Sequence, residues 1–496
     1  MAGDVMNHAP RLLGDLLPGL AADVAAVPVS GLTVDSRKVS PGMVFLAVKG
    51  HADDGRKYMD AAIRAGAVAI IADAPCDPAR WRLPVLEVEN LSTQLSAIAG
   101  RFYDQPSRQL KLIGITGTNG KTSCAWSVAQ MLEIMGQPCG LIGTLGSGRY
   151  GHLESLGNTT PDAVAVQALL AEWRDGGAQW AAMEVSSHGL AQHRVAALHY
   201  EAAVFTNLSQ DHLDYHGSMA AYGAEKARLT SWPELPLAVI NRDDEFGRRL
   251  IVQSTASQVV DYSLRDSAAA VWAENIHCDI HGSRATLNTP WGRLELVSSL
   301  LGEFNLSNLV ASCSALLAMG LPLAEVESAL RRIEPVPGRM EWLRADDDVL
   351  VVIDFAHTED ALKQALETLR PLTGGGAVHC VFGCGGDRDI GKRPGMGRVA
   401  AALADRVTLT SDNPRSESPE KIIDDIAAGA AGKNAEVEIE VDRHLAIASA
   451  VARAEPGDIV LIAGKGHEQT QEIGGQRFPF SDIDHAREAI RARGTT

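Results

Sequence analysis

The segment at residues 116–122 carries side chains whose types and order suit the binding of a nucleoside triphosphate. It reads Thr-Gly-Thr-Asn-Gly-Lys-Thr, follows an apolar run at residues 112–115 and precedes a helix-compatible stretch, residues 123–135. In a strand–turn–helix unit of this kind, free backbone N–H groups and the helix dipole face an anion, and glycine lets the backbone approach it closely. The Lys121 ammonium can reach a terminal phosphate, and the Thr122 hydroxyl can ligate Mg²⁺.

This loop is a shorter variant of the P-loop, because Ile115 stands where the strict pattern has glycine, five residues before Gly120. The alternative is an ordinary strand-to-helix turn in which Gly-Lys-Thr occurs by chance. The chain has the strand, the glycines, the lysine and the threonine in the order of a P-loop, which favours the phosphate site. The residues expected to bind the triphosphate are Gly117, Thr118, Asn119, Gly120, Lys121, Thr122 and Ser123.

Two further motifs, residues 183–190 and 206–217, each lie at the end of an apolar, strand-like run. Ligands gather at the carboxyl ends of parallel strands, so Glu184 and His212 can supply oxygen and imidazole ligands to a metal beside the phosphates. A strand-end glutamate by itself is more often a capping or ion-pair residue. Spacing alone makes Lys226 an ordinary solvated surface lysine. The interpretation of these three residues therefore depends on whether they share one site with the loop.

These motifs need parallel strands to position them, and the rest of the chain supplies candidates. Apolar, strand-like runs alternate with helical lengths, which predicts an α/β fold with parallel sheets covered on both faces. The start of the loop segment and a break at residues 334–338 (Glu-Pro-Val-Pro-Gly) indicate three domains, residues 1–107, 108–336 and 337–496. The predicted strands are residues 43–48, 68–72, 85–88, 112–115, 181–185, 202–206, 237–241, 349–355, 377–383, 406–410 and 459–463.

Composition limits the class of protein. The chain has 496 residues, is 46% hydrophobic and 22% charged, and carries a formal net charge of −17, which is typical of a globular protein. The negative charge disfavours nucleic acid as a ligand, so an anionic substrate would need a locally positive pocket. No apolar run approaches the ~18 residues of a membrane helix, and no signal peptide is indicated. The seven cysteines show no redox or zinc spacing, so we expect reduced thiols in a cytoplasmic enzyme.

Several of these motifs occur, in the same order, in the Mur ligases, the ATP-dependent amino-acid-adding enzymes of peptidoglycan synthesis. The chain resembles this family over essentially its whole length. It is most similar to the members that add the third residue of the stem peptide to UDP-N-acetylmuramoyl-L-alanyl-D-glutamate. The resemblance implies an N-terminal uridine-nucleotide domain, a central P-loop-type ATPase domain and a Rossmann-like C-terminal domain for the amino acid. The segments that carry it are residues 116–122, 159–162, 184–190, 207–217, 226, 302–308, 337–341 and 354–358.

The resemblance also implies roles for individual residues. Lys121, Glu184, His212 and Lys226 match catalytic positions, and Lys226 matches a lysine that carries a CO₂-derived carbamate. Thr122, Glu184, His212 and that N6-carboxylysine would hold Mg²⁺, since a carbamate turns an ammonium into an anionic oxygen ligand. The further positions matched to ATP binding are Asn305, Asn308, Arg339, Asp354 and His357. The positions matched to the UDP-N-acetylmuramoyl dipeptide are Ser36, on the uridine side, and Thr159, Thr160, Ser186, Gln192 and Arg194.

A few positions stay open. The amides of Asn305 and Asn308 can read an adenine edge, but Asn305 is about as well explained as the N-cap of a helix. Glu359 stands where the family usually has proline, and Gln210 stands where many members have arginine. Neither change removes a catalytic group, although either could alter nucleotide affinity.

The added amino acid is predicted from three segments that each follow a predicted strand. A guanidinium forks onto a carboxylate, so a substrate with an extra carboxylate and a distal ammonium would meet Arg415 and Arg388, with Glu468 facing the ammonium. meso-Diaminopimelate is such a substrate, and the Asp-Asn-Pro-Arg tetrad at residues 412–415 resembles the motif of the diaminopimelate-adding members. The alternative is an Asx-type turn before a helix at residues 418–420, which would itself aim Arg415. The residues assigned to this substrate are Arg388, Asp412, Asn413, Pro414, Arg415, Gly464 and Glu468.

The expected reaction is amide formation through an acyl phosphate, with release of ADP and phosphate, by a monomer that binds no nucleic acid and inserts into no membrane. A sister ligase such as MurF or folylpolyglutamate synthase would lack the tetrad beside Gly464. A P-loop kinase or switch GTPase would need a guanine-reading motif, of which residues 241–244 are a poor version. A non-catalytic nucleotide-binding scaffold is disfavoured by the intact Lys121, Glu184, His212 and Lys226.

Overall fold

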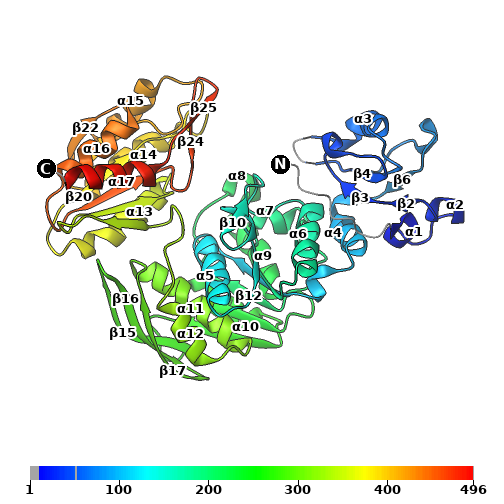
Figure 1. The fold of residues 1–496 in the computed structure, drawn as a ribbon, viewed down its shortest axis with the longest axis horizontal. Helices are drawn as coiled ribbons and strands as arrows, with labels where there is room; N and C mark the ends of the chain where they lie inside the picture. Colours follow the sequence, from blue (N-terminus) through cyan, green and yellow to red (C-terminus); the bar gives the residue numbers. More distant parts are fainter. Residues whose placement is uncertain (1–10, 51–52, 495–496) are drawn as a thin grey trace. The chain divides into compact units, whose positions relative to one another are not determined.

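The computed structural model describes residues 11–50 and 53–494. The chain forms two compact units. The first comprises residues 1–273, 288–293 and 308–329, and the second comprises residues 274–287, 294–307 and 330–496. Both are built from mainly parallel sheets flanked by helices (Figure 1), so the predicted α/β class is confirmed. Among the helices of the described residues, none combines the length and the apolar character that crossing a bilayer requires.

The first unit begins with a four-stranded parallel sheet in the order β3-β4-β5-β6. All five residues of β5 are buried, as expected for a strand that is covered on both faces. Helix α4 (Leu91–Phe102) packs Leu91, Leu95, Ile98 and Phe102 against this sheet, at the three- and four-residue spacing of one helix face. The strands are β3 (Gly31–Thr33), β4 (Met43–Ala47), β5 (Ala69–Asp73) and β6 (Val85–Val88), and the shorter elements are β1 (Arg11–Leu12), β2 (Pro28–Val29), α1 (Leu13–Leu16), α2 (Ala22–Ala25) and α3 (Met59–Arg64).

The second sheet of the first unit places three neighbouring strands where the predicted motifs need them. Strand β7 (Lys111–Thr116) lies between β11 (Trp180–Glu184) and β12 (Ala202–Phe205), and all three are parallel. Their carboxyl ends therefore lie side by side, and each is followed by one of the three motifs. The sheet continues with β8 (Cys139–Gly143), β9 (Gly146–Arg149) and β10 (His152–Glu154) on the β11 side, and with β13 (Leu237–Asn241) and β14 (Gln258–Ser263) beyond β12.

Helices connect these strands. Helix α5 (Lys121–Ile134) follows the glycine loop and is buried along most of its length. Helix α6 (Ala163–Asp175) begins at Asp162, whose side chain accepts from the N–H groups of Val164 and Ala165 and so caps the helix. The others are α7 (Ser187–Ala191), α8 (Leu213–His216), α9 (Met219–Thr230) and α10 (Glu245–Gln253). Two further helices, α11 (Glu303–Ala318) and α12 (Leu323–Leu330), come later in the chain, after residue 298.

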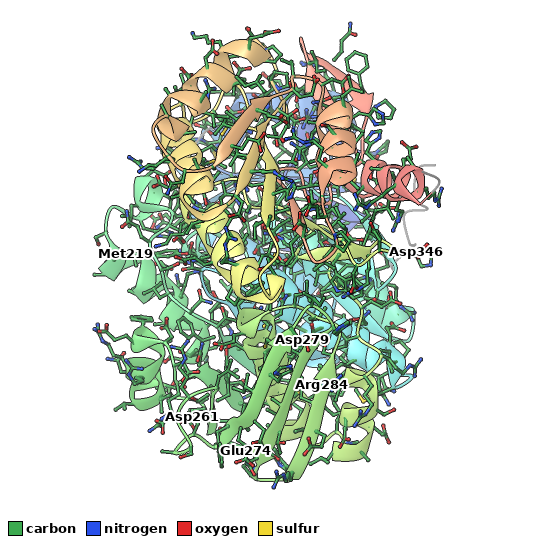
Figure 2. The ribbon with its side chains drawn as sticks, turned by 90° about the vertical axis from the view of Figure 1, so that its left-hand side faces the viewer. Met219, Asp261, Glu274, Asp279, Arg284 and Asp346 are labelled. Atoms are coloured by element: carbon green, nitrogen blue, oxygen red, sulfur yellow. The ribbon has the colours of Figure 1, made fainter. Side chains whose placement is uncertain are left out.

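Three long strands that were not predicted follow β14. They are β15 (Val271–Asp279), β16 (Gly282–Thr289) and β17 (Gly292–Ser298), which hydrogen-bond in that order. Figure 2 shows them as a ribbon, with Glu274 and Asp279 toward opposite ends of β15 and Arg284 on β16. From Asn275 onward, polar and apolar residues alternate along β15. The predicted strands were recognised as continuous apolar runs. A strand in which every second residue is polar has no such run and was therefore missed.

The second unit contains a six-stranded sheet in the order β18-β19-β23-β20-β21-β22, in which only β18 is antiparallel. Strand β23 pairs with both β19 and β20, so Ala463 lies beside Asp354 and Phe382 at one edge. Strand β20 also pairs with β21, so the three segments expected to line one edge follow the neighbouring strands β20, β21 and β23. The strands are β18 (Glu341–Arg344), β19 (Leu350–Asp354), β20 (Val378–Phe382), β21 (Arg406–Leu409), β22 (Glu436–Ile439) and β23 (Ile459–Ala463).

Two hydrophobic clusters cover the two faces of this sheet. Helices α13, α14 and α15 contribute to one cluster, and α16 and α17 contribute to the other. A hairpin of β24 (Thr470–Ile473) and β25 (Gln476–Pro479) turns at Gly474 and Gly475, whose φ angles are 58° and 76°. Such a two-residue turn favours glycine at both positions. The helices are α13 (Glu359–Leu369), α14 (Lys392–Leu403), α15 (Pro419–Ala430), α16 (Arg443–Arg453) and α17 (Asp482–Arg493).

Candidate active site

The loop between β7 and α5 has the tight conformation that a phosphate-binding turn needs. Gly117 and Gly120 adopt positive φ angles of 148° and 85°. A Cβ atom at Gly117 would lie 1.9 Å from Thr206 Oγ1, and one at Gly120 would lie 2.4 Å from Asn308 Oδ1. Both glycines are therefore required by the close approach of neighbouring segments as well as by the backbone angle.

Lys121 is the first residue of α5, and its side chain turns back over the loop. Its Nζ atom donates to the carbonyl oxygens of Gly117 at 2.9 Å and Thr118 at 2.7 Å. The ammonium thus lies at the N-terminal end of a buried helix, where the backbone dipole already favours an anion. This is the arrangement that the sequence predicted for a terminal phosphate.

Glu184 ends β11 and is 1% exposed. Its carboxylate accepts hydrogen bonds from the Thr122 hydroxyl at 3.0 Å and from the backbone N–H and hydroxyl of Thr144 at 2.7 and 3.2 Å. Thr122 and Glu184 therefore present oxygen atoms, the donor type that Mg²⁺ prefers, beside the loop. Thr144 was not predicted, because the strand before it, Cys139–Gly143, contains two glycines and resembles a turn in the sequence.

Lys226 is buried rather than solvated, so the surface-lysine alternative is wrong. The residue is 1% exposed, and its Nζ donates to the Gly117 carbonyl at 2.6 Å. The ammonium also lies 4.6 Å from the centre of the Tyr222 ring. Burial, and then the nearby charge of Lys121, lower the pKa of Lys226 well below its usual range. A neutral amine is thus favoured at this position.

His212 also lies near the Tyr222 ring. It is exposed, and its ring centre is 6.1 Å from that of Tyr222 and 4.8 Å from that of His188. The Tyr222 hydroxyl is 3.2 Å from Thr118 Oγ1 in the loop. Tyr222 therefore connects His212, Lys226 and the loop. Neither Tyr222 nor His188 was singled out from the sequence, although both lie within motifs that carry the other site residues.

The residues matched to the dipeptide form one hydrogen-bonded network. Arg194 donates to the Thr160 carbonyl at 2.6 Å and to Gln192 Oε1 at 2.7 Å. The Thr160 hydroxyl donates to the Glu184 carbonyl at 2.8 Å and accepts from the Ser186 N–H at 3.0 Å.

Thr159 joins this network through Thr144, since the two hydroxyls are 3.1 Å apart. Five of the six predicted positions are thus brought together around Glu184. Ser36 takes no part among the described contacts. It begins the turn Ser36–Lys38 on the N-terminal sheet.

The residues matched to ATP divide between the two units. Asn308 contacts the loop at Gly120, as described above. Asn305 lies inside α11, which begins at Glu303, and donates to the Leu301 carbonyl at 3.0 Å. The N-cap alternative for Asn305 is therefore wrong.

In the second unit, the end of β19 gathers the other three residues. Asp354 accepts from the N–H groups of Met340 and Ala356, both at 2.8 Å. The Arg339 guanidinium lies 4.8 Å from the Phe355 ring centre, and the His357 ring lies 4.7 Å from it. Phe355 was not predicted, yet it is the side chain that Arg339 and His357 share.

Asn413 and Glu468 of the predicted amino-acid site meet at the end of β23. The Asn413 amide donates to Glu468 Oε2 at 2.8 Å. Lys465, which is 0% exposed, donates to Asn413 Oδ1 at 3.0 Å, to Glu468 Oε2 at 2.9 Å and to the Thr470 carbonyl at 2.9 Å. Burial alone would raise the pKa of Glu468, but the Lys465 ammonium and these hydrogen bonds hold it below its usual value. Lys465 lies between the predicted residues Gly464 and Glu468 but was not itself predicted.

Arg415 is held by the β24–β25 hairpin. Its backbone N–H donates to the Glu472 carbonyl at 3.0 Å, and its guanidinium lies 3.7 Å from Glu472 Oε2 and donates to the Gly386 carbonyl at 2.5 Å. The Asp412 carboxylate accepts from the neighbouring Asn413 N–H at 2.7 Å instead of closing an Asx turn, and helix α15 starts at Pro419, as expected.

Gly464 and Pro414 are buried in the same site. A Cβ atom at Gly464 would lie 2.6 Å from Asp412 Oδ2, so this glycine lets the two segments approach. Pro414 follows Asn413 and is also buried. Arg388 is exposed and stays outside this set of contacts, so its role remains a prediction.

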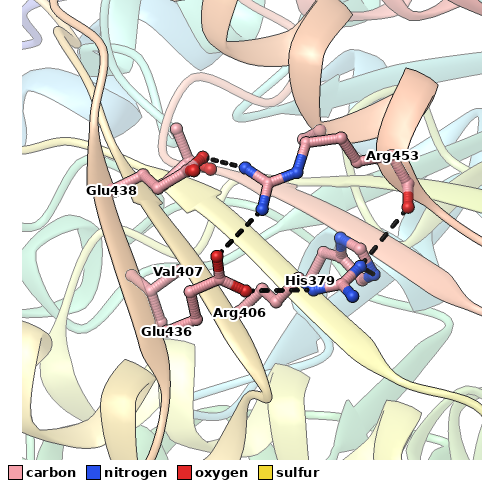
Figure 3. Close-up of a pocket in the computed structure, with 8 residues that line it drawn as sticks. His379, Arg406, Val407, Glu436, Glu438 and Arg453 are labelled. Atoms are coloured by element: carbon pink, nitrogen blue, oxygen red, sulfur yellow. Dashed lines mark hydrogen bonds and ion pairs between the residues drawn. The ribbon is translucent and has the colours of Figure 1, made fainter.

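A charged cavity at the opposite ends of these strands is too small for a substrate. It measures about 10 Å³ and is lined by residues of β20, β21, β22 and α16. Figure 3 shows Arg453 reaching Glu436 and Glu438 there, with His379 beside Arg406. A cavity of this size holds at most one water molecule. The cluster therefore ties helix α16 to the sheet rather than binding a ligand.

Three family models match consecutive parts of the chain. The Mur ligase family catalytic domain matches residues 28–103, the Mur ligase middle domain matches residues 115–316, and the Mur ligase glutamate ligase domain matches residues 338–466. Together they give the three-domain α/β architecture that the resemblance implied.

Full-length relatives agree with these models. A protein of Ectopseudomonas mendocina (strain ymp) named UDP-N-acetylmuramoyl-L-alanyl-D-glutamate--2,6-diaminopimelate ligase is 52% identical over 97% of this chain and 99% of its own. A protein of the same name from Chromobacterium violaceum is 48% identical over 99% of both chains. A solved structure with that enzyme name superposes with a TM-score of 0.75 at 36% identity, covering 98% of this chain and 100% of the other.

Proposed function

Because this chain belongs to the Mur ligase family, we propose that it is the ATP-dependent ligase that joins meso-2,6-diaminopimelate to UDP-N-acetylmuramoyl-L-alanyl-D-glutamate. Relatives that are 52% and 48% identical over nearly the whole chain bear the name of that reaction. The choice of amino acid is supported by the hydrogen bond between Asn413, in the Asp-Asn-Pro-Arg tetrad, and Glu468. This bond brings the segment that carries Arg415 next to a carboxylate.

The first step takes place at the glycine loop. Lys121 and the N–H groups at the start of α5 stabilise the charge of the γ-phosphate while the γ-carboxylate of the dipeptide's D-glutamate attacks it. The P–O bond to ADP breaks, and an acyl phosphate forms. Two anions must meet in this step, so positive charge beside the phosphates is the main electrostatic requirement. The network of Thr160, Ser186 and Arg194 around Glu184 supports binding of the dipeptide next to the loop.

The donor atoms at the loop fit Mg²⁺. Thr122 and Glu184 supply oxygens 3.0 Å apart, and His212 and a carbamylated Lys226 would complete the set. Lys226 fits carbamylation because burial lowers its pKa, and the neutral amine is the form that attacks CO₂. When bound there, the ion would shield the negative charge of the phosphates.

The second step uses the amino-acid site. Arg415 forks onto the distal carboxylate of diaminopimelate, and Glu468 receives the distal ammonium. Both hydrogen bonds that Glu468 accepts use Oε2, and its side chain is 35% exposed, which leaves room for a substrate ammonium at this carboxylate. The other amine attacks the acyl carbon, and the tetrahedral intermediate expels phosphate to leave the amide.

The remaining assignments belong to the same proposal. Ser36 contacts the uridine nucleotide, and Asn305, Asn308, Arg339, Asp354 and His357 contact ATP. The domain boundaries fall after residues 107 and 336. The protein acts as a monomer in the cytoplasm, where both ATP and nucleotide-linked precursors are made.

An assay of ATP hydrolysis with the UDP-muramoyl dipeptide tests this function. Release of phosphate and formation of the tripeptide product should require the dipeptide and should be much faster with meso-diaminopimelate than with L-lysine as acceptor. Equal rates with L-lysine would refute the proposed specificity for diaminopimelate but not the proposed ligase activity. Hydrolysis without any product would refute the ligase itself.

A further inference from the structure

Helices α16 and α17 are locked together by a buried ion pair. Arg443 and Asp482 are both 0% exposed at the side chain, and their two contacts are 2.7 and 2.8 Å long. Each residue is the first of its helix, so the pair fixes the two N-terminal turns relative to one another. A bidentate contact of this kind leaves little rotational freedom. Side chains near these two residues therefore have nearly fixed positions.

Three such side chains converge on one point. His444 follows Arg443, His485 lies one turn after Asp482, and Glu488 lies one turn further along α17. His444 Nδ1 is 2.8 Å from His485 Nδ1, which is 3.4 Å from Glu488 Oε2. One ligand atom from each of the three lies within 4.8 Å of the others, and no other such group occurs among the described residues. The Phe480 ring packs against His485, with ring centres 4.5 Å apart.

Hydrogen bonding alone explains this convergence poorly. His485 Nδ1 can carry only one proton, and it faces both a second imidazole nitrogen and a carboxylate, which only accepts when ionised. This nitrogen has a single in-plane site, either an N–H or a lone pair, so it can satisfy only one of the two contacts. A cation between the three atoms would be satisfied by all of them.

We propose that His444, His485 and Glu488 form a binding site for a divalent transition metal of the Zn²⁺ class. Two imidazoles and a carboxylate are common zinc ligands, whereas Mg²⁺ prefers oxygen donors alone. With metal–nitrogen distances of about 2.0–2.1 Å, neighbouring ligand atoms of a tetrahedral site lie about 3.3 Å apart. The observed separations of 2.8 and 3.4 Å reach this value with small side-chain rotations. Because Glu488 is exposed, water can fill the fourth position.

Such a metal would strengthen the connection between α16 and α17 that the Arg443–Asp482 ion pair makes next to the proposed amino-acid site. Arg443 donates to the carbonyl oxygens of Ser411 at 3.3 Å and Ala463 at 3.0 Å. These residues immediately precede Asp412 and Gly464. The metal is therefore a structural clip between two helices rather than a participant in the chemistry.

The test uses the full-length protein without a histidine tag, stripped of metal by a chelator. Calorimetric titration with Zn²⁺, and the visible spectrum after Co²⁺ addition, should show one tetrahedral site, and Zn²⁺ should raise the thermal midpoint. His444→Ala and His485→Ala should each weaken this binding by about tenfold or more. His152→Ala, at an exposed histidine on β10, is the matched control and should bind as the wild type does. The site should also persist in His212→Ala, which separates it from the loop.

Two outcomes would overturn the proposal. If His444→Ala and His485→Ala bind Zn²⁺ as tightly as the wild type, the histidines form only a hydrogen-bonded pair. If the metal-stripped wild type shows no Zn²⁺ site beyond the one lost in His212→Ala, the cluster holds no metal. Each variant is first checked for an unchanged far-ultraviolet circular dichroism spectrum. Glu488→Gln changes an exposed residue and should leave the fold intact, so its Zn²⁺ titration tests the site independently of folding.

Discussion

Two buried lysines, one in each unit, show how the same side chain serves opposite purposes. Lys226 is 1% exposed and donates to a neutral carbonyl, and none of the described carboxylates pairs with it. Lys465 is 0% exposed but lies 2.9 Å from Glu468 and makes two further hydrogen bonds. Burial without an ion pair favours the neutral amine, whereas an ion pair keeps the ammonium. In the proposed mechanism the first lysine is available for carbamylation, and the second supports its neighbours.

The comparison extends to the sites around the two lysines. At the loop, the close approach of glycine backbones makes room for an anionic ligand, and Lys226 joins that backbone directly. At the amino-acid site, Glu468 and Arg415 already have partners inside the protein, Lys465 and Glu472. If diaminopimelate binds here as proposed, it would share or exchange these partners. The proposed specificity would then depend on how well the internal partners hold the two charged groups in place.

The largest effect is expected for Lys226→Ala. Turnover should fall by about 100- to 1000-fold, because the proposed carbamate ligand of Mg²⁺ is lost and, with it, charge stabilisation at the reacting phosphates. Short carboxylates such as acetate should restore part of the rate by entering the vacated space. The measurement is the rate of phosphate release with and without added acetate. Lys433→Ala, at an exposed lysine, is the control, and a wild-type rate in Lys226→Ala would show that the two lysines do not differ in this way.

Lys465→Met should destabilise the second unit. The change leaves the half-buried Glu468 carboxylate without its ammonium, which should cost about 3 kcal/mol in the free energy of unfolding. The KM for diaminopimelate should also rise, since Asn413 and Glu468 lose their common donor. Urea unfolding and acceptor titration measure the two effects. Lys433→Met provides the same substitution at an exposed site, and equal stability of the two variants would contradict a supporting role for Lys465.

Arg415→Ala separates the two sites functionally. The variant should lose about 1–3 kcal/mol of transition-state binding for diaminopimelate, as for a charged hydrogen bond, while ATP binding stays unchanged. Kinetics at saturating ATP with varied acceptor give the first quantity, and nucleotide titration gives the second. Unchanged acceptor kinetics would remove the argument for the extra carboxylate. Arg388→Ala, at the exposed arginine, should have the smaller effect.

The smallest effect is a gain in stability for Lys226→Met, by about 1 kcal/mol at neutral pH in CO₂-free buffer. Burial lowers the pKa of Lys226 in the folded protein, whereas the unfolded chain keeps a value of about 10.4. Between the two values the unfolded state binds more protons, so wild-type stability rises with pH there. The advantage of the methionine variant should therefore shrink as the pH approaches about 10.4. A gap that is independent of pH would show that Lys226 folds with its proton.

The three active-site motifs of the first unit could be predicted because each follows an apolar strand. Runs such as Ala202–Phe205 are buried on both faces, so their hydrophobicity marks them in the sequence. Parallel strands then place Glu184 and the loop at the same edge by register alone. The depth of Lys226 could not be predicted, since it depends on how α9 packs under the loop, and α9 shows the same local pattern as a surface helix.

Other residues of the site could not be predicted from the sequence, for different reasons. Thr144 follows a short strand with two glycines, and Tyr222 and Phe355 act through ring contacts that no spacing rule predicts. Lys465 stands in a glycine-rich motif, where a lysine normally indicates a phosphate or solvent. The second half of β15 alternates polar and apolar residues, and the partners of β15–β17 are neighbours that the sequence analysis had not assigned as strands.

The hairpin of β24 and β25 links the proposed amino-acid site to a second, distant stretch of chain. It donates from Gln471 to the Asp412 carbonyl and from the Glu472 N–H to Asn413 Oδ1, at 2.8 and 2.9 Å. Transplanting only the four residues of the tetrad into a lysine-adding relative should therefore fail to convert it. A successful exchange of preference would have to carry the hairpin as well.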